Sequence, residues 1–92
     1  MKQKLHEAID DFVSLCKTAF QFGAAEFAEK NFHQIVDNFC EDDKSDEENL
    51  KAVKGIFEAN EKLNSNGMGN PEAAHLFRVF NNGWLNKRML VL

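Results

Sequence analysis

The sequence predicts an all-α fold, either a compact bundle or an orthogonal array of four helices, followed by a short C-terminal helix or an extended tail. Three observations support this prediction. Apolar residues recur every three or four positions in four separate segments, which is the spacing of one helix face. Residues typical of helix starts and ends separate these segments. The chain has nine phenylalanines, one tryptophan and no tyrosine, so its aromatic residues suit a core more than a binding surface.

A chain of 92 residues is the size of one domain, and we expect residues 1–92 to form a single helical unit. A hydrophobic content of 43% is sufficient for a core, so disorder is not expected. The net charge of −4 is unevenly spread, because residues 1–70 hold 14 of the 15 acidic residues but only 8 of the 11 basic ones. An acidic body disfavours broad nucleic-acid binding, which depends on neutralising phosphates, and suits a basic protein partner.

The first two helices are expected over residues 2–21 and from Ala24 to about residue 40, and the second, with three phenylalanines, is expected to form the floor of the core. Gly23 between them is expected to adopt the left-handed conformation that commonly ends a helix. So short a connection predicts a hairpin or a sharp corner. The expected apolar faces are Leu5, Ile9, Phe12, Val13, Cys16, Ala19 and Phe20 in the first helix, and Ala25, Ala28, Phe32, Ile35 and Phe39 in the second.

The start of the third helix has a specific sequence signal. Ser45 and Glu48 match the Ser-x-x-Glu capping box, in which each side chain binds the other residue's backbone N–H. The helix is therefore expected from near Asp46 to the segment 64–67. Its expected apolar face comprises Leu50, Val53, Ile56 or Phe57, and Leu63.

Asn70 followed by Pro71 predicts the start of a fourth helix, with asparagine as the N-cap and proline at the first helical position. The pair Asn82-Gly83 is expected to break this helix. Residues 84–92 then suit a short fifth helix, which we favour, or the second strand of a hairpin, because Asn-Gly is also a type I′ turn signal. The residues expected to point inward are Ala73, Ala74, Phe77 and Phe80.

Two features are candidates for partner binding. One is the acidic segment between the second and third helices, and the other pairs a tryptophan with an arginine, the side chains most enriched at interface hot spots. Both also have structural explanations, since the acids suit a solvated linker with capping residues and the tryptophan suits a cap on a small core. The candidate residues are Glu41, Asp42, Asp43, Asp46, Glu47, Trp84 and Arg88.

His6 with Asp10, and His33 with Asp37, form two His-x-x-x-Asp pairs, each spanning about one helical turn. We interpret them as surface pairs that stabilise their own helices. No metal site is predicted, because the pairs lie on polar faces and the two helices would not obviously bring them together. The segment 37–48 does not fit a calcium loop, since it has phenylalanine at the third position and aspartate where glycine is required at the sixth.

Cys16 and Cys40 are the only cysteines, and we expect both to be reduced thiols in a cytoplasmic protein. Cys16 lies on the apolar face of the first helix and is interpreted as a core residue. Cys40 lacks the hydrogen-bonded base that a nucleophile needs, on motif grounds. The chain shows no secretory signal and no run of the roughly 18 apolar residues of a membrane span. We therefore predict no catalytic residues, metal or cofactor.

The short length, the uneven charge and the missing catalytic motifs favour a non-enzymatic protein that inhibits or adapts a larger basic partner, for example one that processes nucleic acid. Size and charge resemble those of small acidic helical proteins that block a basic enzyme, such as bacterial nuclease immunity proteins or phage-encoded inhibitors of host defence, although no motif supports this analogy. Two alternatives stay open. One is a homodimer or larger homo-oligomer whose Leu90, Val91 and Leu92 dock on a neighbour, and the other is a small metal-dependent enzyme that uses the His/Asp pairs. Direct contact with nucleic acid or a membrane is not expected.

Overall fold

Every element that the structure describes is helical, which confirms the all-α prediction. The structure is a computed structural model that describes residues 2–19 and 23–89. Residues 20–21, at the expected end of the first helix, and the proposed docking tail, Leu90 to Leu92, lie outside these ranges. The elements are α1 (Lys2–Ala19), α2 (Ala24–Phe39), α3 (Asp46–Leu63), α4 (Pro71–Arg78) and α5 (Asn86–Met89), with the π-helical segments η1 (Asn64–Met68) and η2 (Val79–Leu85).

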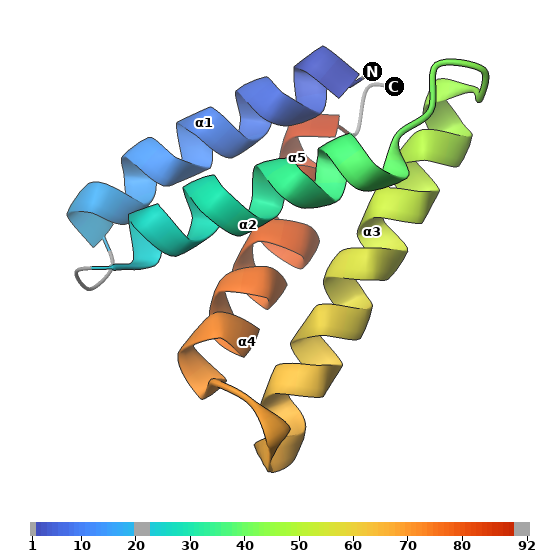
Figure 1. Cartoon of the computed structure of the whole chain (residues 1–92). Helices are drawn as coiled ribbons and strands as arrows, with labels where there is room; N and C mark the ends of the chain where they lie inside the picture. Colours follow the sequence, from blue (N-terminus) through green and yellow to red (C-terminus); the bar gives the residue numbers. More distant parts are fainter. Residues whose placement is uncertain (1, 20–22, 90–92) are drawn as a thin grey trace.

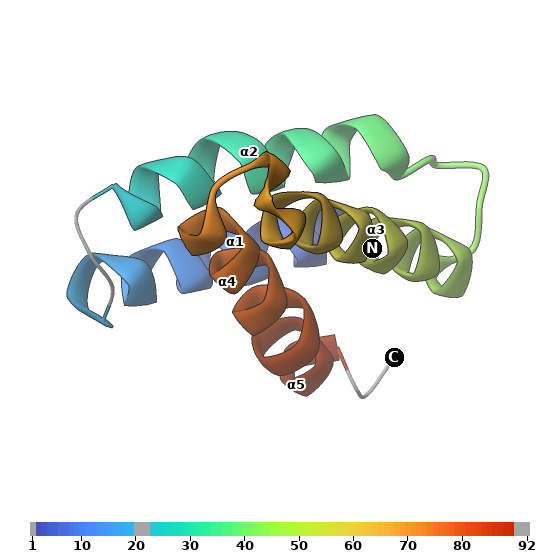
Figure 2. The same ribbon diagram turned by 90° about the horizontal axis from the view of Figure 1, so that it is seen from below.

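The helices form an orthogonal array of two antiparallel pairs (Figure 1). α1 and α2 lie side by side as a hairpin, and α3 packs along α4 in a direction that crosses the hairpin. Figure 2 views the molecule from below and shows α4 and α5 running at an angle to the α1–α2 hairpin. The Cα radius of gyration is 12.6 Å, close to the value of about 12 Å expected for a compact domain of this length.

Three of the expected helix boundaries are confirmed. Gly23 has a φ of 101°, in the left-handed region that glycine favours, and lies directly before α2. The Ser45 Oγ accepts a hydrogen bond from the backbone N–H of Glu48 at 3.1 Å, as an N-cap does. The Glu48 carboxylate in turn accepts from the Ser45 hydroxyl, where a full capping box would have it accept from the backbone N–H. The Asn70 Oδ1 caps α4 by accepting from the N–H of Glu72.

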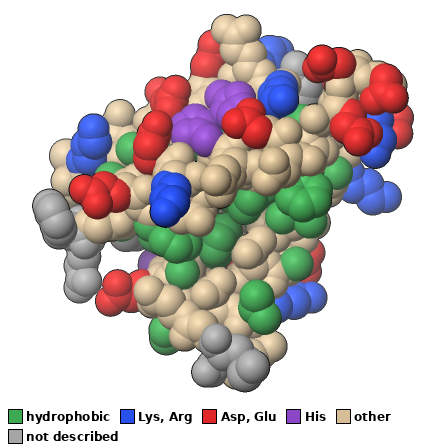
Figure 3. All heavy atoms as spheres, in the orientation of Figure 1, with side chains coloured by type: hydrophobic (Ala, Val, Ile, Leu, Met, Phe, Trp, Pro, Cys, Tyr) green, Lys and Arg blue, Asp and Glu red, His purple; other side chains and the backbone are tan. Residues whose placement is uncertain are grey.

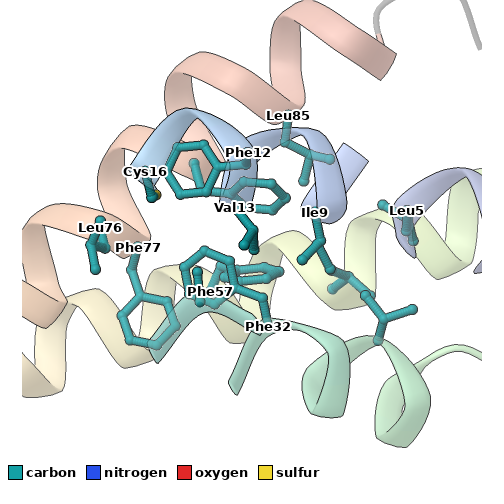
Figure 4. Close-up of a cluster of buried hydrophobic side chains, with 14 of the residues drawn as sticks. Leu5, Ile9, Phe12, Val13, Cys16, Phe32, Phe57, Leu76, Phe77 and Leu85 are labelled. Carbon is teal, nitrogen blue, oxygen red and sulfur yellow. The ribbon is translucent and has the colours of Figure 1, made fainter. Parts of the chain in front are cut away.

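The core is a cluster of phenylalanines from all the long helices, with Phe32 of α2 at its centre (Figure 4). The ring centroid of Phe32 lies 6.0 Å from that of Phe12 in α1, and 5.0 Å from those of Phe57 in α3 and Phe80 in η2. All four side chains are fully buried. The aromatic content is thus largely structural, and α2 is the floor on which the other helices pack.

The buried face of α2 differs from the expected one. It follows an i, i+4 spacing and consists of Ala28, Phe32 and Val36, and the buried Cys40 continues the same spacing beyond the end of α2. Ile35 is only half-buried, and Phe39 is 41% exposed. The reason is that Cys40, not Phe39, occupies the last core position where the chain leaves α2.

Smaller corrections apply to the ends of α1 and α3. Ala19, at the last position of α1, is exposed, and Leu63, at the last position of α3, is 60% exposed. Both are the last residues of their helices, where the apolar face ends. The four residues expected to point inward from the fourth helix, Ala73, Ala74, Phe77 and Phe80, are all buried.

The pair Asn82-Gly83 does not break the fourth helix, because η2 carries the chain through it in wide π-helical turns into α5. The buried Asn81 amide donates to the carbonyl of Lys54 at 3.2 Å, and the Lys54 ammonium donates to the carbonyl of Asn81 at 3.1 Å. Burial lowers the pKa of Lys54 at this contact. These bonds tie η2 to α3. The helical alternative is confirmed for residues 84–89, and the hairpin alternative is wrong.

Candidate functional site

The two histidines of the helical hairpin meet on its outer surface, each beside carboxylates (Figure 3). The Nδ1 atoms of His6 and His33 are 2.6 Å apart. The Nε2 atom of His6 lies 2.9 Å from Oδ1 of Asp37, and the Nε2 atom of His33 lies 2.9 Å from Oδ1 of Asp10. These four residues form a continuous polar chain, named here the histidine seam.

Each histidine finds its carboxylate partner on the opposite helix, which corrects the prediction that the pairs stabilise their own helices. His6 and Asp37 are equally far from the middle of the short connection between α1 and α2, and so are Asp10 and His33. Such positions face each other in an antiparallel helical hairpin. Both helices carry the same His-x-x-x-Asp spacing, but they run in opposite directions. Each histidine therefore meets the aspartate of the other helix. This matched distance from the turn is the signal that could have predicted the seam.

The two imidazole rings meet edge to edge. Their planes are inclined by 23° and their centroids are 4.8 Å apart, so a Nδ1···Nδ1 distance of 2.6 Å requires the two nitrogens to point at each other. One of these nitrogens must donate a proton and the other must accept it. The two Nε2 atoms face carboxylate oxygens, so all four ring nitrogens of the pair have a polar partner.

A third carboxylate approaches the seam at His33. Glu29, one turn earlier on α2, places its Oε2 3.6 Å from Nε2 of His33. The side chains of Asp10 and Glu29 are 63% and 57% exposed, whereas that of His33 is 19% exposed. The His33 ring is therefore held at the edge of the packed hairpin, and two carboxylates reach its Nε2 atom from the solvent side.

The predicted acidic residues lie in the connection between α2 and α3 and in the first turn of α3. This stretch, residues 41–48, is named here the acidic loop and lies at the upper right of Figure 3. All eight residues are exposed. The backbone beneath them is tied down by Asn49 of α3, which is only 5% exposed. Its Oδ1 accepts from the N–H of Glu41 and its Nδ2 donates to the carbonyl of Glu41, both at 2.9 Å. The acidic loop thus has an anchored backbone and solvent-facing side chains.

A shallow hollow borders the acidic loop, and Lys2 of α1 and Cys40 form part of its lining. The Lys44 ammonium lies 3.1 Å from Oε2 of Glu41, and this carboxylate raises the pKa of Lys44. Burial raises the pKa of the Cys40 thiol, which disfavours the thiolate that a nucleophile needs. The hollow is therefore a polar surface feature and lacks an activated thiol.

Sequence reasoning missed Phe39 as a surface residue, since its position on the α2 stripe pointed to the core. It is 41% exposed and lies only two residues before the acidic loop begins. The signal that could have shown this exposure is Cys40, which is the next member of the i, i+4 series of buried residues. An exposed aromatic side chain next to a charged loop resembles the apolar centre and polar rim of a protein interface.

The other predicted partner-binding pair, Trp84 and Arg88, packs against α1. The Trp84 Nε1 donates to the carbonyl of Ala8 at 3.0 Å, and its ring centroid lies 5.8 Å from that of Phe12. The Arg88 guanidinium lies 5.4 Å from the Trp84 ring centroid and forms an ion pair with Asp11. Trp84 is half-buried and Arg88 is exposed.

The acidic loop and the Trp84–Arg88 pair do not form one surface. Lys2, beside the acidic loop, and Asp11, the partner of Arg88, are nine residues apart on α1. That separation corresponds to about two and a half helical turns, so the two side chains leave α1 on opposite sides. The two sets of predicted residues therefore represent separate candidate surfaces.

The remaining sequence candidates add no further polar site. Cys16 and Cys40 are both buried, and burial raises the pKa of both thiols. None of the described helices combines the length and the apolar character that crossing a bilayer requires. No family model, no curated protein and no solved structure matches this chain.

Proposed function

We propose that the protein is a small, non-enzymatic binding module that docks on a larger basic protein through the acidic loop, with Phe39 as an apolar contact at its edge. One observation carries this proposal. The buried Asn49 side chain holds both backbone groups of Glu41, so an exposed set of carboxylates has an anchored backbone.

The charge of the acidic loop suits a basic partner. Residues 41–48 contain six acidic residues and one lysine. Complementary charges of this kind steer association and select partners, and they act over about 8 Å at physiological ionic strength. Docking is thus expected to depend on salt mainly through the association rate.

The anchoring of the loop reduces the cost of binding. Ordering a flexible loop on association opposes affinity, and a loop that is already ordered avoids much of this cost. Here the Asn49 bonds anchor its first residue, and the Ser45 N-cap anchors its last turn to α3. The backbone that carries the carboxylates is therefore already held at both ends before a partner binds.

Phe39 supplies the apolar component that the charges lack. Aromatic side chains are enriched in the buried centre of interfaces, and charged residues are typical of the rim. With 41% of its surface exposed, Phe39 still has apolar area to bury. Leu63 is the other large exposed hydrophobic residue of the described chain, and it lies at the far end of α3.

The electrostatic part of the proposal is tested by charge reversal. A tagged protein captures its partner from the native host, and association is then measured for Asp42→Lys combined with Asp43→Lys. The matched control is Glu7→Lys combined with Glu58→Lys, which makes the same change in net charge at exposed sites on α1 and α3. We expect slower association for the loop variant alone, with a difference that shrinks as salt rises. Equal rates for both variants at low salt would contradict the proposal.

The apolar part is tested by truncation. Phe39→Ala should speed dissociation with little salt dependence, whereas Leu63→Ala should not. Trp84→Ala serves as a comparison, because its ring packs on Phe12. We expect it to lower the melting temperature and to affect binding only through stability. Faster dissociation for Trp84→Ala at an unchanged melting temperature would move the interface to the Trp84–Arg88 pair.

Self-association is distinguished by size-exclusion chromatography with light scattering. A monomer that binds a separate basic protein agrees with the proposal. A stable dimer that dissociates on Phe39→Ala would instead assign this surface to contact between two copies of the chain.

A further inference from the structure

We propose that Asp10, Glu29 and His33 bind a divalent transition-metal cation, with Zn²⁺ as the representative ion, on the outer face of the α1–α2 hairpin. This site lies away from the acidic loop and does not depend on the function proposed above. It combines one residue of α1 with two residues of α2, so the bound cation would join the two helices.

The donor atoms have the type and spacing that a metal requires. The His33 Nε2 atom lies 2.9 Å from Oδ1 of Asp10 and 3.6 Å from Oε2 of Glu29, and all three donor atoms lie within 4.8 Å of one another. Ligands bound at about 2.0–2.2 Å in a tetrahedral site are roughly 3.3–3.6 Å apart. Small rotations of the two exposed carboxylates would complete this arrangement. Imidazole with carboxylate oxygens is a common donor set for zinc.

The surroundings favour a cation at this end of the seam. Two carboxylates face the Nε2 atom of His33 and balance the charge of a divalent ion. At the opposite end, the Lys2 ammonium already approaches Asp37 at 3.9 Å. Because Asp10 and Glu29 are more than half exposed, the ion can enter from solvent and keep a water molecule as its fourth ligand.

The outer contacts of the seam support the same assignment. His33 presents its Nε2 atom to the two carboxylates while its Nδ1 atom faces Nδ1 of His6, and Nε2 of His6 faces Asp37. Metal-binding histidines typically have the second ring nitrogen held by an outer hydrogen bond of this kind, which fixes the ring orientation.

His6 is therefore a positioning residue and not a ligand in this proposal. Its Nδ1 atom faces His33 and its Nε2 atom faces Asp37, so neither nitrogen points toward the Asp10 and Glu29 carboxylates. Its role is to accept the His33 Nδ1 proton, which fixes the ring orientation and leaves Nε2 free for the metal.

Zinc titration by calorimetry tests the ligands. The wild-type protein should bind one Zn²⁺ per chain, and His33→Ala should lower the affinity by at least a hundredfold. Asp10→Asn and Glu29→Gln should each lower it about tenfold or more. Two matched controls, His75→Ala on α4 and Glu26→Gln one turn before Glu29 on α2, should bind zinc as the wild type does.

Two further measurements separate metal binding from folding and from thiol binding. Each variant is melted in EDTA, and Glu29→Gln should melt like the wild type because Glu29 is exposed. The visible spectrum of the Co²⁺ form should show tetrahedral nitrogen and oxygen coordination without sulfur-to-metal charge transfer. A spectrum with that charge transfer would assign the ion to Cys40 and overturn the proposal.

The positioning role of His6 has its own test. His6→Ala should weaken zinc binding about 10–100-fold, and His6→Gln should restore part of the affinity because an amide oxygen can also accept from His33. A merely structural role would lower the melting temperature in EDTA without this rescue of affinity. The proposal is overturned if the wild type binds no zinc, or if His33→Ala binds zinc as tightly as the wild type.

Discussion

The histidine seam and the acidic loop are both rich in carboxylates, yet their hydrogen bonds are organised in opposite ways. In the seam, side chains bind side chains across two helices, as His6 does with His33 and Asp37. In the acidic loop, the contacts stay within one short stretch of chain: Asn49 binds the backbone of Glu41, Lys44 pairs with Glu41, and the carboxylates remain at the surface. The seam joins its charged groups across two helices, whereas the acidic loop holds its own within one segment.

This difference indicates which kind of ligand suits each region. At one end of the seam, the Asp10 and Glu29 carboxylates converge on Nε2 of His33, and the three donor atoms lie within 4.8 Å of one another, so this end suits the small cation proposed above. Those of the acidic loop are spread along eight exposed residues, so the loop suits a protein surface. The four predictions below test how strongly each region depends on the core and on its own polar contacts.

The largest effect is expected for Phe32→Ala, because Phe32 is fully buried and contacts α1, α3 and η2. Replacing a buried phenylalanine by alanine costs about 3–5 kcal/mol, which is a large part of the roughly 5–15 kcal/mol that stabilises a domain. Chemical denaturation measures the loss. Phe39→Ala is the control on the same helix and should cost less than about 1 kcal/mol. A denaturation midpoint near wild type for Phe32→Ala would contradict the assigned core.

Next in size is Asn49→Ala, which should cost about 2 kcal/mol because two backbone groups of Glu41 lose their buried partner. The amide of Glu41 should also exchange its hydrogen faster. Asn38→Ala, at an exposed position of α2, should leave stability unchanged. Unchanged exchange at Glu41 would show that Asn49 does not anchor the acidic loop.

Ser45→Ala should cost about 1 kcal/mol, and Ser45→Gly should cost less, because the Ser45 hydroxyl caps α3 at the N–H of Glu48. Thermal and chemical denaturation both report this loss. The difference between alanine and glycine matters, since glycine leaves the backbone of the cap accessible to water. Equal and negligible losses for the two variants would place the start of α3 elsewhere.

The smallest effect is expected in the seam without metal. A double-mutant cycle of His6→Ala and Asp37→Ala in EDTA should give a coupling free energy of about 0.5–1 kcal/mol, because the pair is solvent-exposed. The exposed pair Glu58 and Lys62 on α3 should give about 0.3–0.5 kcal/mol. Zero coupling for His6 and Asp37 would show that the seam contacts are not formed in solution.

Much of the fold could be predicted from the sequence, because helix boundaries depend on nearby residues. Gly23, the Ser45 N-cap and the Asn70 N-cap each act within about one turn, and each is confirmed. The buried positions Phe12, Phe32 and those of α4 also follow local periodicity.

The predictions from sequence were wrong where the burial or conformation of a residue depends on its surroundings in the folded chain and not on its neighbours in sequence. Phe39 and Leu63 have the periodicity of core residues, but they are the last residues of α2 and α3, and their side chains are exposed. Asn82-Gly83 has the composition of a break, but the bonds between Asn81 and Lys54 hold η2 against α3 and keep it helical.

The sequence by itself determined where the four long helices begin, most of their apolar positions and the presence of an acidic loop, because propensity, capping and periodicity act between neighbouring residues. Only the tertiary structure decided what the polar residues do. The partner exchange of His6 and His33 depends on the register of two packed helices. The anchoring of Glu41 depends on a buried asparagine eight residues later. The physical reason is that hydrogen bonds need atoms placed within a few tenths of an ångström, and such placement follows from packing.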